Sequence, residues 1–457
     1  MKTPPTVALS LDSSAPIDRK VRVLETFLGE HYFAESGIMY SMWRYDADAG
    51  VARPWVEADL DGQIFHQGIP CSNTEWLHGE NSPFTSGLFL ASQALRYRVT
   101  GDEQALAFAR RAFGSLDKIA RLSEAVGEPG WLCKPYGWRY SHETSPDQYM
   151  AAVYGLWQFR PIATAAERAR VDDLLVSWAD RWRKQGCKLV YFGTEYDFFN
   201  STAHWAVFPC FQEMAFAVTG DARYRAESQR LIDRMNGYAR DRSLSGWLTQ
   251  MDMMKPSPWF PAEFPVEDET RRPFLMYDTE HRGATWLIAM ALDLMASQRS
   301  DLAEAVAEYL PRAMNYAALG LREDRLHHYA IAIDMERMTW QPLAADWPGK
   351  TPKFSWEMHS SSMCWGDAAG RLPHMAAITQ RHAPTATWAG GELRTGGPMA
   401  LARRMWQALD NRRLQWMIDP DGKQIPDEVR YAKQTLSSEV HANTSLSYWH
   451  ARANGLV

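Results

Sequence analysis

The chain has 457 residues, 46% of them hydrophobic and 23% charged, with a formal net charge of −6. These values are typical of a folded soluble protein, long enough for two or three ordinary domains or for one large closed repeat. The mildly acidic balance, without a basic block, argues against nucleic acid as a partner, and no stretch is long and apolar enough for a membrane span.

The beginning of the chain and its cysteines indicate where the protein works. The segment MKTPPTVALSLDSSAPIDRK at 1–20 has no continuous apolar region and makes a poor signal peptide. The five cysteines are odd in number and include no CxxC pair, which is typical of free thiols in a reducing compartment. We therefore expect a cytoplasmic protein, although a periplasmic protein whose signal had been removed would look similar.

Apolar residues recur at helical spacing along most of the chain, as at Phe84, Leu88, Ala91 and Leu95. Alternating, strand-like runs are rare, and KLVYFG at 188–193 is a short exception. The expected helices come in pairs joined by short turns: 82–99 with 103–124, 146–159 with 163–185, 201–218 with 221–240, 280–297 with 301–319, and 360–380 with 398–410.

A sixth pair would join the two ends of the chain, a helix at 17–29 and segments after 427. Two turns inside pairs are near-copies, RVTGDEQALAFARRA at 98–112 and AVTGDARYRAESQRL at 217–231. In each, Gly ends one helix and Asp caps the next. Helix pairs that repeat in this way suggest either an open solenoid or a closed ring.

The segments between the pairs favour the ring. They are long, polar and rich in aromatic residues, whereas the turns inside the pairs are short and plain. In a closed (α/α)6 toroid all inner helices run the same way, so their N-termini and the loops before them face one cavity. We therefore predict an all-α fold, a single (α/α)6-toroid domain over residues 1–457, with long loops over one mouth.

The segment HETSPDQYMAAVYGLW at 142–157 points to a functional site. It crowds His142, Glu143 and Asp147 at the start of one expected helix, where a cap needs only one of them. Asp147 could instead complement the helix dipole. Acidic residues, His and Trp recur at matching points of five pairs, however, which favours a shared site over repeated capping.

We expect the candidate residues to line one pocket. The candidate catalytic residues are Asp147, Glu80, His204 and Glu143. The candidate substrate-binding residues are Asn200, Tyr149, Trp131, Trp138, Trp205, Tyr277, Asp278, Glu280, His281, Arg282, Glu357, His359 and Trp365. Flat aromatic faces beside carboxylates and amides suit sugar rings, although the 20 Trp residues could also serve core packing.

Other kinds of site find little support in the sequence. The chain contains no HExxH motif, cysteine cluster, phosphate loop, dinucleotide fingerprint or GxSxG elbow. We therefore expect no metal, no cofactor and no nucleophile triad. The expected partner is an oligosaccharide substrate, with neither nucleic acid nor a membrane, and the oligomeric state is left open.

The hairpins with TGD turns, and SPDQYMAAVYGLW as one inner helix, resemble the six-hairpin glycosidase superfamily and, within it, the unsaturated glucuronyl and rhamnogalacturonyl hydrolases. The resemblance is best over residues 80–320. In those hydrolases an inner helix opens with a short polar turn and an Asp that donates a proton, and Asp147 matches that Asp. Glu80, 21 positions before Gly101, stands where the family usually has Asp.

The resemblance implies a glycoside hydrolase that acts on oligosaccharides containing an unsaturated uronic acid. Asp147 would protonate the C4=C5 double bond, and water would add at C5. In an ordinary carboxylate pair, Glu80 or Glu143 would instead activate water or attack carbon, and the residues leave both mechanisms open. A basic side chain would bind the sugar carboxylate, and the candidates are Arg139, Arg282 and Lys134.

Other classes of protein remain open. A polysaccharide lyase on a related toroid would use Asn200 and His204 to neutralise the uronate and Tyr277 or His281 as the base, and the segments NSTAHW and YDTEH resemble that set. A sugar epimerase or a non-catalytic carbohydrate-binding toroid would share only the fold.

Overall fold

The computed structural model describes most of the helical framework and parts of the segments between its helices. The described residues are 4–60, 70–191, 193–197, 206–238, 268–278, 281–318, 321–322, 326–328, 331–334, 337, 339–342, 364–365, 368–385, 397–418, 431 and 434–457. Within these ranges, no helix has both the length and the apolar character needed to cross a membrane.

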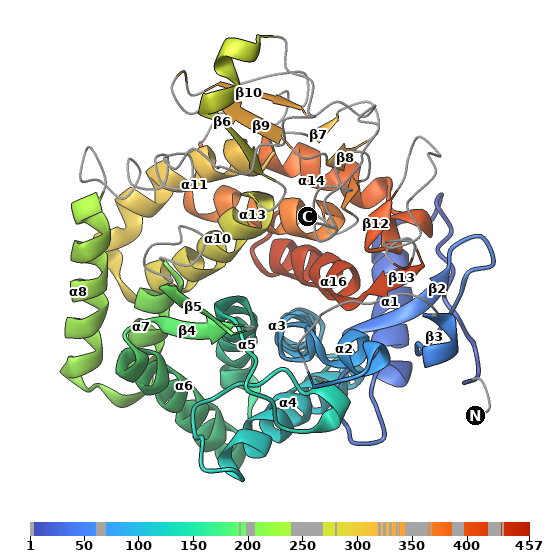
Figure 1. The fold of residues 1–457 in the computed structure, drawn as a ribbon, viewed down its shortest axis with the longest axis horizontal. Helices are drawn as coiled ribbons and strands as arrows, with labels where there is room; N and C mark the ends of the chain where they lie inside the picture. The colour runs from blue at the N-terminus through green and yellow to red at the C-terminus, as the bar shows by residue number, and fades with distance from the viewer. Residues whose placement is uncertain are drawn as a thin grey trace.

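An inner ring of helices surrounds the centre of the molecule (Figure 1). In ring order, its members are α3 (Ser82–Thr100), α5 (Pro146–Phe159), α7 (Val207–Thr219), α10 (His281–Gln298), α13 (Ala368–His382) and α16 (Ser438–Ala453). Each contacts the next, and α16 contacts α3, so the ring is closed.

An outer layer of helices covers this ring. Five outer helices each follow their inner partner along the chain and pack against it: α4 (Glu103–Glu124), α6 (Ala165–Gln185), α8 (Ala222–Tyr238), α11 (Ala303–Ala317) and α14 (Pro398–Gln407). The outer partner of α16 is α1 (Ile17–His31), from the other end of the chain. In the described part of the chain the toroid therefore has six inner and six outer helices, which confirms the predicted all-α (α/α)6 fold.

The predicted helix boundaries agree closely with the observed ones, with one clear correction. The helix expected at 360–380 begins only at Ala368, because Cys364 and Trp365 form strand β11, which pairs with β12 (Met417–Ile418). A strand partner from a distant segment takes the backbone hydrogen bonds that a helix would form locally. Residues 201–205 of another predicted helix lie outside the described residues.

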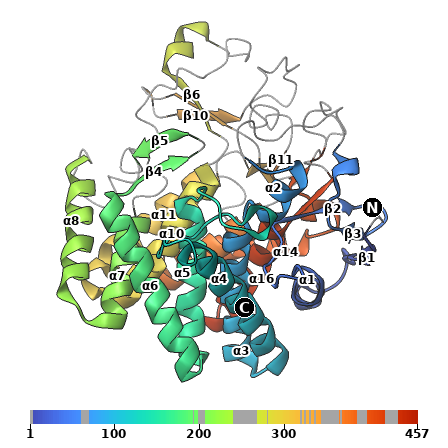
Figure 2. The ribbon, with the colours of Figure 1, turned by 60° about the horizontal axis from the view of Figure 1, so that its bottom comes forward.

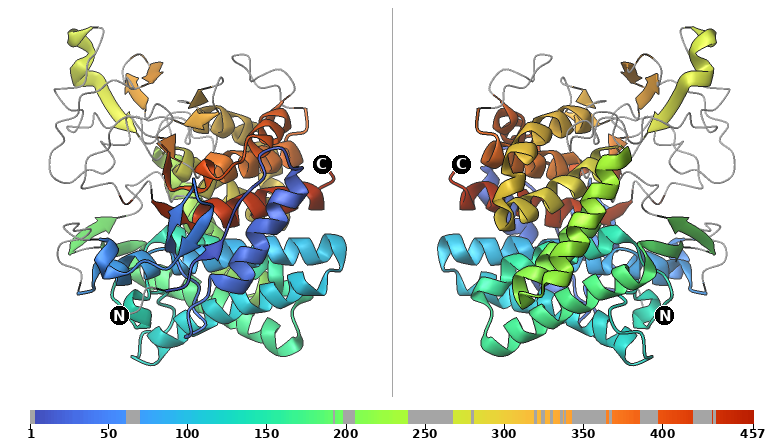
Figure 3. Two further views of the ribbon diagram at one scale, coloured as in Figure 1. Left: turned by 90° about the vertical axis from the view of Figure 1, so that its right-hand side faces the viewer. Right: turned by 90° about the vertical axis from the view of Figure 1, so that its left-hand side faces the viewer.

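Short antiparallel strands occupy the connections between helices. They form one four-stranded sheet, one three-stranded sheet and two-stranded pairs: β1 (Val7–Ala8), β3 (Val51–Arg53), β2 (Met42–Asp46) and β13 (Thr435–Ser437); β10 (Thr339–Pro342), β9 (Ile331–Asp334) and β6 (Leu275–Asp278); β4 (Lys188–Tyr191) with β5 (Thr194–Asp197); and β7 (Leu321–Arg322) with β8 (His327–His328). Figures 2 and 3 show β4, β5, β6 and β10 together on one side of the ring.

The two TGD turns have the same structure, as their sequences predict. Gly101 and Gly220 both end helices in the left-handed conformation with φ of 69°, which Gly adopts without a steric cost. Asp102 Oδ1 accepts the N–H of Gln104 at 2.9 Å, and Asp221 Oδ1 accepts the N–H two residues further on at 3.0 Å. Each Asp thus caps an outer helix.

α3 and α5 approach each other closely through a pair of glycines. A Cβ built on Gly87 would lie 2.3 Å from the carbonyl oxygen of Ala151, and one built on Gly155 would lie 2.3 Å from the carbonyl oxygen of Gly87. No real Cβ fits at that distance, so alanine at either position would push the helices apart. This close contact lets the first turns of both helices meet.

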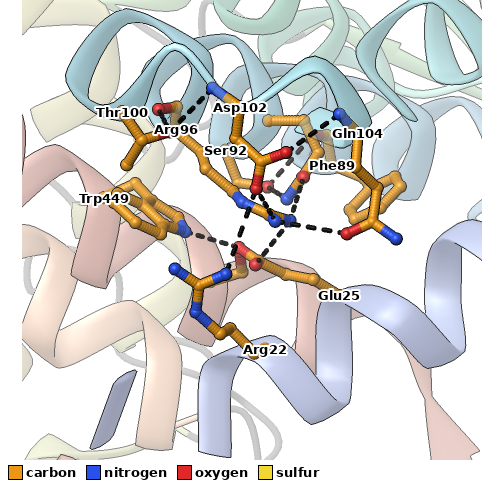
Figure 4. A network of polar contacts seen from close by, with 11 residues as sticks. Arg22, Glu25, Phe89, Ser92, Arg96, Thr100, Asp102, Gln104 and Trp449 are labelled. Carbon is orange, nitrogen blue, oxygen red and sulfur yellow. Dashed lines mark hydrogen bonds and ion pairs between the residues drawn. The ribbon is translucent and has the colours of Figure 1, made fainter. Parts of the chain in front are cut away.

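A buried polar network joins the two ends of the chain (Figure 4). Glu25 on α1 accepts hydrogen bonds from Ser445 Oγ at 2.5 Å and from Trp449 Nε1, both on α16, and from Arg96 Nη1 on α3 at 3.1 Å. The side chains of Glu25 and Arg96 are 0% and 2% exposed. Burial raises the pKa of Glu25, and the charge of Arg96 opposes this change.

Removal of the cation from this network should destabilise the ring. In Arg96→Met the buried Glu25 loses its charged partner, and we expect the free energy of unfolding to fall by about 3–5 kcal/mol. The control Arg121→Met removes an i,i+4 pair with Asp117, in which the Arg121 side chain is 62% exposed, and should cost about 0.3–0.5 kcal/mol. Urea unfolding measures both variants. Equal losses of unfolding free energy in the two variants would contradict a stabilising role for the buried network around Glu25, at the seam between the first and last helices.

Candidate active site

The first turns of α3 and α5 meet at the mouth of the ring where both helices begin, which we call the N-terminal mouth. Gln148, whose side chain is fully buried, joins them. Its Oε1 accepts the backbone N–H of Phe84 at 3.1 Å, and its Nε2 donates to Asn81 Oδ1 at 2.9 Å and to Asp147 Oδ2 at 3.2 Å. One amide therefore satisfies an N–H at the start of α3 that the helix leaves unpaired and fixes two polar side chains beside it.

Asp147 reaches this mouth because of the way in which α5 begins. Pro146 occupies the first helical turn, where its missing N–H costs nothing. Ser145, the residue before the helix, makes no side-chain cap hydrogen bond, and the described contact of the half-buried Asp147 is with Gln148. The carboxylate is thus held by a neighbouring amide beside α3, and no described hydrogen bond uses it as a cap.

Glu80 lies next to this pair, between α2 (Asn73–Gly79) and α3, and is 8% exposed. Its carboxylate accepts hydrogen bonds from Lys134 Nζ and Tyr136 OH. Because the Lys134 side chain is only 3% exposed, Glu80 and Lys134 form a buried ion pair. Lys134, which was expected to bind a sugar carboxylate, has Glu80 as its described partner. The contacts of Glu80 join residues 134–136 to the start of α3.

Trp138 follows on the same segment and belongs to a small aromatic surface. Its half-buried ring stacks on His78, with centroids 6.1 Å apart and planes 8° apart, and meets Tyr40 edge-on at 5.1 Å. Burial lowers the pKa of His78 to about 4, so the imidazole is neutral at pH 7 and packs as an aromatic ring. His78 stands two positions before Glu80 and Trp138 two positions after Tyr136, so the contact between Glu80 and Tyr136 also places these two rings.

Two predicted substrate contacts belong instead to the wall of the ring. Trp131 is 5% exposed, and its Nε1 donates to the carbonyl oxygen of Ser141 at 3.1 Å. Tyr149 is 0% exposed, and its hydroxyl donates to the carbonyl oxygen of Gly130 at 2.9 Å and accepts the N–H of Leu132 at 2.7 Å. Tyr149 was expected to bind substrate, but here its side chain is fully buried and its hydroxyl is hydrogen-bonded to the backbone.

The other members of the HETSPD segment and the nearby Arg139 lie further out. His142 is exposed, with Nδ1 3.1 Å from the hydroxyl of Tyr140, and Glu143 is half-buried. Arg139 is exposed and makes a bidentate ion pair with Glu75, in which Nη1 lies 2.7 Å from Oε1 and Nη2 lies 3.2 Å from Oε2. Arg139 therefore already has a carboxylate partner, whereas the sequence predicted that it would bind a sugar acid.

Several predicted residues fall outside what the structure describes. Asn200, His204, Trp205, Glu280, Glu357 and His359 lie outside the described residues. For five others only the backbone is described: Tyr277, Asp278, His281, Arg282 and Trp365. Their elements are β6, the start of α10 and β11, so the segment YDTEH leads into an inner helix as expected.

Gln148 stands out in the sequence, because a Gln in the first turn of an otherwise apolar helix needs partners when it is buried, but its contacts with Asn81 and Phe84 could not be predicted. Sequence reasoning missed Tyr136. The contact between Tyr136 and Glu80 spans 56 positions and leaves no local signature in the sequence.

The described part of the N-terminal mouth offers neither a metal site nor a reactive thiol. Across the described ranges, no group of three or more His, Cys, Asp or Glu side chains is placed to hold a metal ion. The described cysteines are free thiols, and burial raises the pKa of Cys71, near α2, to about 11. Thiolate chemistry is therefore disfavoured there at neutral pH.

No protein-family profile and no curated protein matches the sequence. Solved structures do match over nearly the whole chain. An unsaturated glucuronyl hydrolase specific for heparin has 10% identity and a TM-score of 0.46, with 95% of this chain and 96% of that chain covered. An unsaturated glucuronyl hydrolase from Streptococcus agalactiae has 11% identity and a TM-score of 0.42, with 100% and 98% covered.

A more distant match is an α-1,6-mannanase of Salegentibacter sp. HEL1_6, with 9% identity, a TM-score of 0.30, and 96% and 99% of the two chains covered. These proteins are six-hairpin glycosidases, the superfamily that the sequence resembles. Because all three TM-scores lie below 0.5, the fold assignment rests on the helix contacts described above, and the function rests on the site.

The role of Tyr149 in the wall can be tested by removing its hydroxyl. In Tyr149→Phe a buried carbonyl and a buried N–H lose their partner, so we expect a loss of about 1–3 kcal/mol in the free energy of unfolding. Tyr140→Phe, which removes a hydroxyl at an exposed contact, is the matched control and should change stability by less than about 0.5 kcal/mol. A Tyr149→Phe protein as stable as the control would contradict the structural role.

Proposed function

We propose that the chain is a glycoside hydrolase that acts on oligosaccharides containing an unsaturated uronic acid, with Asp147 as the general acid. The observation that carries the proposal is the placement of Asp147. It is a half-buried carboxylate in the first turn of an inner helix, held by Gln148 beside Asn81 and Glu80. A partly buried carboxylate held in place by a neighbouring amide has the fixed position that proton transfer to a bound substrate requires.

The direction of the inner helices supports an acidic substrate. α3 and α5 both begin at the N-terminal mouth, so each directs the positive end of its dipole there. Lys134 and Arg139 are paired with Glu80 and Glu75. A sugar carboxylate would therefore rely on the helix ends and on Arg282, which stands in the first turn of α10.

The aromatic surface around Trp138 supports a sugar ring as the bound group. Trp138 stacks with His78 on one part of its ring system and remains half-buried, so part of the indole is open to a ligand. Sugar C–H faces pack on such rings while their hydroxyls bond to neighbouring polar groups. Trp138 therefore belongs to the proposed substrate site.

The proposed reaction adds water across a double bond. Asp147 gives its proton to C4, and the oxygen of a water molecule bonds to C5. The proton that this water loses then returns to the carboxylate of Asp147. Opening of the hemiketal at C5 breaks the bond from C5 to the ring oxygen and leaves a ketone at C5 and a hemiacetal at C1. Collapse of that hemiacetal to an aldehyde breaks the glycosidic bond and releases the rest of the oligosaccharide with a free hydroxyl group. The protein provides the proton and the alignment, which are the two contributions expected from a general acid site.

A single substitution separates catalysis from helix stabilisation. Asp147→Asn keeps the size of the side chain and its ability to serve a helix N-terminus, so the melting temperature should change little, while turnover should fall by about 10²–10⁴-fold. Asp221→Asn, at the cap of outer helix α8, is the control and should keep both properties. If Asp147 only served the dipole, Asp147→Asn would lose at most about 1 kcal/mol and remain active.

The substrate class is tested by incubating the protein with unsaturated and saturated uronyl disaccharides. The proposal predicts that the absorbance of the conjugated double bond disappears from the unsaturated substrate. An increase in that absorbance from the saturated substrate would instead support a lyase. No change with either sugar would contradict the proposed reaction.

Gln148 should affect the pH dependence of the reaction, because it contacts Asp147 directly. Gln148→Glu replaces a hydrogen-bond donor with a second carboxylate, which favours the protonated form of its neighbour. We expect turnover to fall about 10²-fold and the alkaline limb of the pH–rate profile to move to higher pH. Gln158→Glu introduces the same charge at the opposite end of α5 and should leave the profile unchanged; equal profiles for both variants would contradict a role for Gln148.

A further inference from the structure

A cavity of about 260 Å³ lies at the opposite mouth of the ring, where the inner helices end. We call this the C-terminal mouth. The last turns of α3, α5, α10, α13 and α16 line it. Trp157 and Gln158 in its lining are ten and eleven residues beyond Asp147 on the same helix, about 16 Å along the axis, so this cavity is separate from the proposed active site.

A buried polar cluster forms the floor of the cavity. Asp293, 1% exposed, accepts hydrogen bonds from Tyr154 OH at 2.9 Å and Arg381 Nη1 at 2.9 Å, and its Oδ1 lies 2.8 Å from His382 Nε2. Burial acts to raise the pKa of Asp293, but the His382 hydrogen bond and the charge of Arg381 hold that pKa well below its usual range. Asp293 is therefore ionised, and its partners come from α5 and α13.

His450 lines the same cavity and has unused hydrogen-bonding capacity. It is 1% exposed, and neither of its ring nitrogens makes a hydrogen bond; the nearer contact is Nε2 to Asp293 Oδ2 at 3.6 Å. Burial lowers the pKa of His450 to about 4, so the ring is neutral at pH 7. A buried imidazole without a hydrogen bond next to a cavity is the kind of group that a bound molecule satisfies.

The lining offers one positive side chain, Arg98, to an anion. Arg98 and Arg381 are positive and Asp293 is negative, which leaves one positive charge, and Arg381 already serves Asp293. The described partner of the exposed Arg98 is the neutral Oε1 of Gln158 at 3.1 Å. Because the helix C-termini direct partial negative charge at this mouth, an anion would depend strongly on Arg98.

The remaining lining has the character of a sugar site. Trp157 is half-buried and provides an aromatic surface, and the amides of Gln158, Gln298 and Asn454 each carry a donor and an acceptor. The volume is just below the range of about 300–1,000 Å³ that is usual for drug-sized ligands, which suits one monosaccharide.

We propose that the cavity at the C-terminal mouth binds a monosaccharide acid, with Arg98 on its carboxylate and Trp157 along its ring. This second site goes beyond the proposed reaction and does not depend on it. The lining provides one positive group for the carboxylate, an apolar face for the ring and amides for the hydroxyls.

Isothermal titration calorimetry on the full chain tests the proposal, with glucuronate, glucose and inorganic phosphate as probes. We expect glucuronate to bind more tightly than glucose, which lacks the carboxylate, and than phosphate, which lacks the ring. Arg98→Gln should weaken glucuronate binding about 10- to 100-fold, the usual effect of a hydrogen bond to a charged group. Trp157→Leu should weaken it as well, whereas Arg121→Gln on outer helix α4 should not.

Further variants separate this site from the proposed active site. Trp138→Ala at the N-terminal mouth should leave glucuronate binding at the cavity intact, and Arg98→Gln should leave turnover of the unsaturated disaccharide unchanged. The proposal is overturned if glucuronate does not bind, if its binding survives both Arg98→Gln and Trp157→Leu, if Trp138→Ala abolishes it, or if phosphate binds equally well and displaces it. An inactive protein that still binds glucuronate through Arg98 would contradict the proposed function alone.

Discussion

A buried carboxylate at the seam between the first and last helices holds the ring closed. Glu25 on α1 is fully buried and accepts donors from α16 and α3, so neither end of the chain can leave without depriving buried polar groups of their partners. The outer partner of the last inner helix is thus supplied by the beginning of the chain. Closure through this contact is what makes the fold a toroid and not an open stack of hairpins.

Closure gives the ring two chemically different mouths. At the N-terminal mouth the positive ends of α3 and α5 meet, and Gln148 joins Asn81 to Asp147. At the C-terminal mouth the negative helix ends meet arginines, and Asp293 ties residues of α5 and α13 together. The inner helices run in the same direction, so their positive N-terminal ends meet at one mouth and stabilise acidic side chains there. Their negative C-terminal ends meet at the other mouth and stabilise basic side chains.

The periodic parts of the fold could be predicted from the sequence, because helix pairs with TGD turns carry their own signals. Apolar spacing placed α3, α5 and α1 correctly, and Gly101 with Asp102 fixed one turn. The strands were missed apart from the 188–193 run, since most have two to five residues and pair with distant segments; β13, for example, pairs with β2. Short strands leave no periodicity to detect.

The site was predictable only in part, for a related reason. The position of Asp147 in the first turn of an inner helix could be predicted, and the three ionisable residues at that helix start, more than a cap requires, made it a candidate. That Tyr149 faces the wall, or that Lys134 is matched by Glu80, depends on contacts between segments far apart in the chain. A sequence shows which residues share a helix face, but it does not show which partner stands opposite them.

The seam also has a consequence for synthesis on the ribosome. Glu25 and Ser445 are 420 residues apart, and translation at about 5–20 residues per second takes about 20–80 s to cover that distance. During this interval α1 exists without α16, although Leu24, Phe27 and Leu28 are buried in the finished ring. The first helix made can pack early against α3 and α4, but the part of its apolar face that α16 covers must avoid wrong partners until the end of the chain emerges.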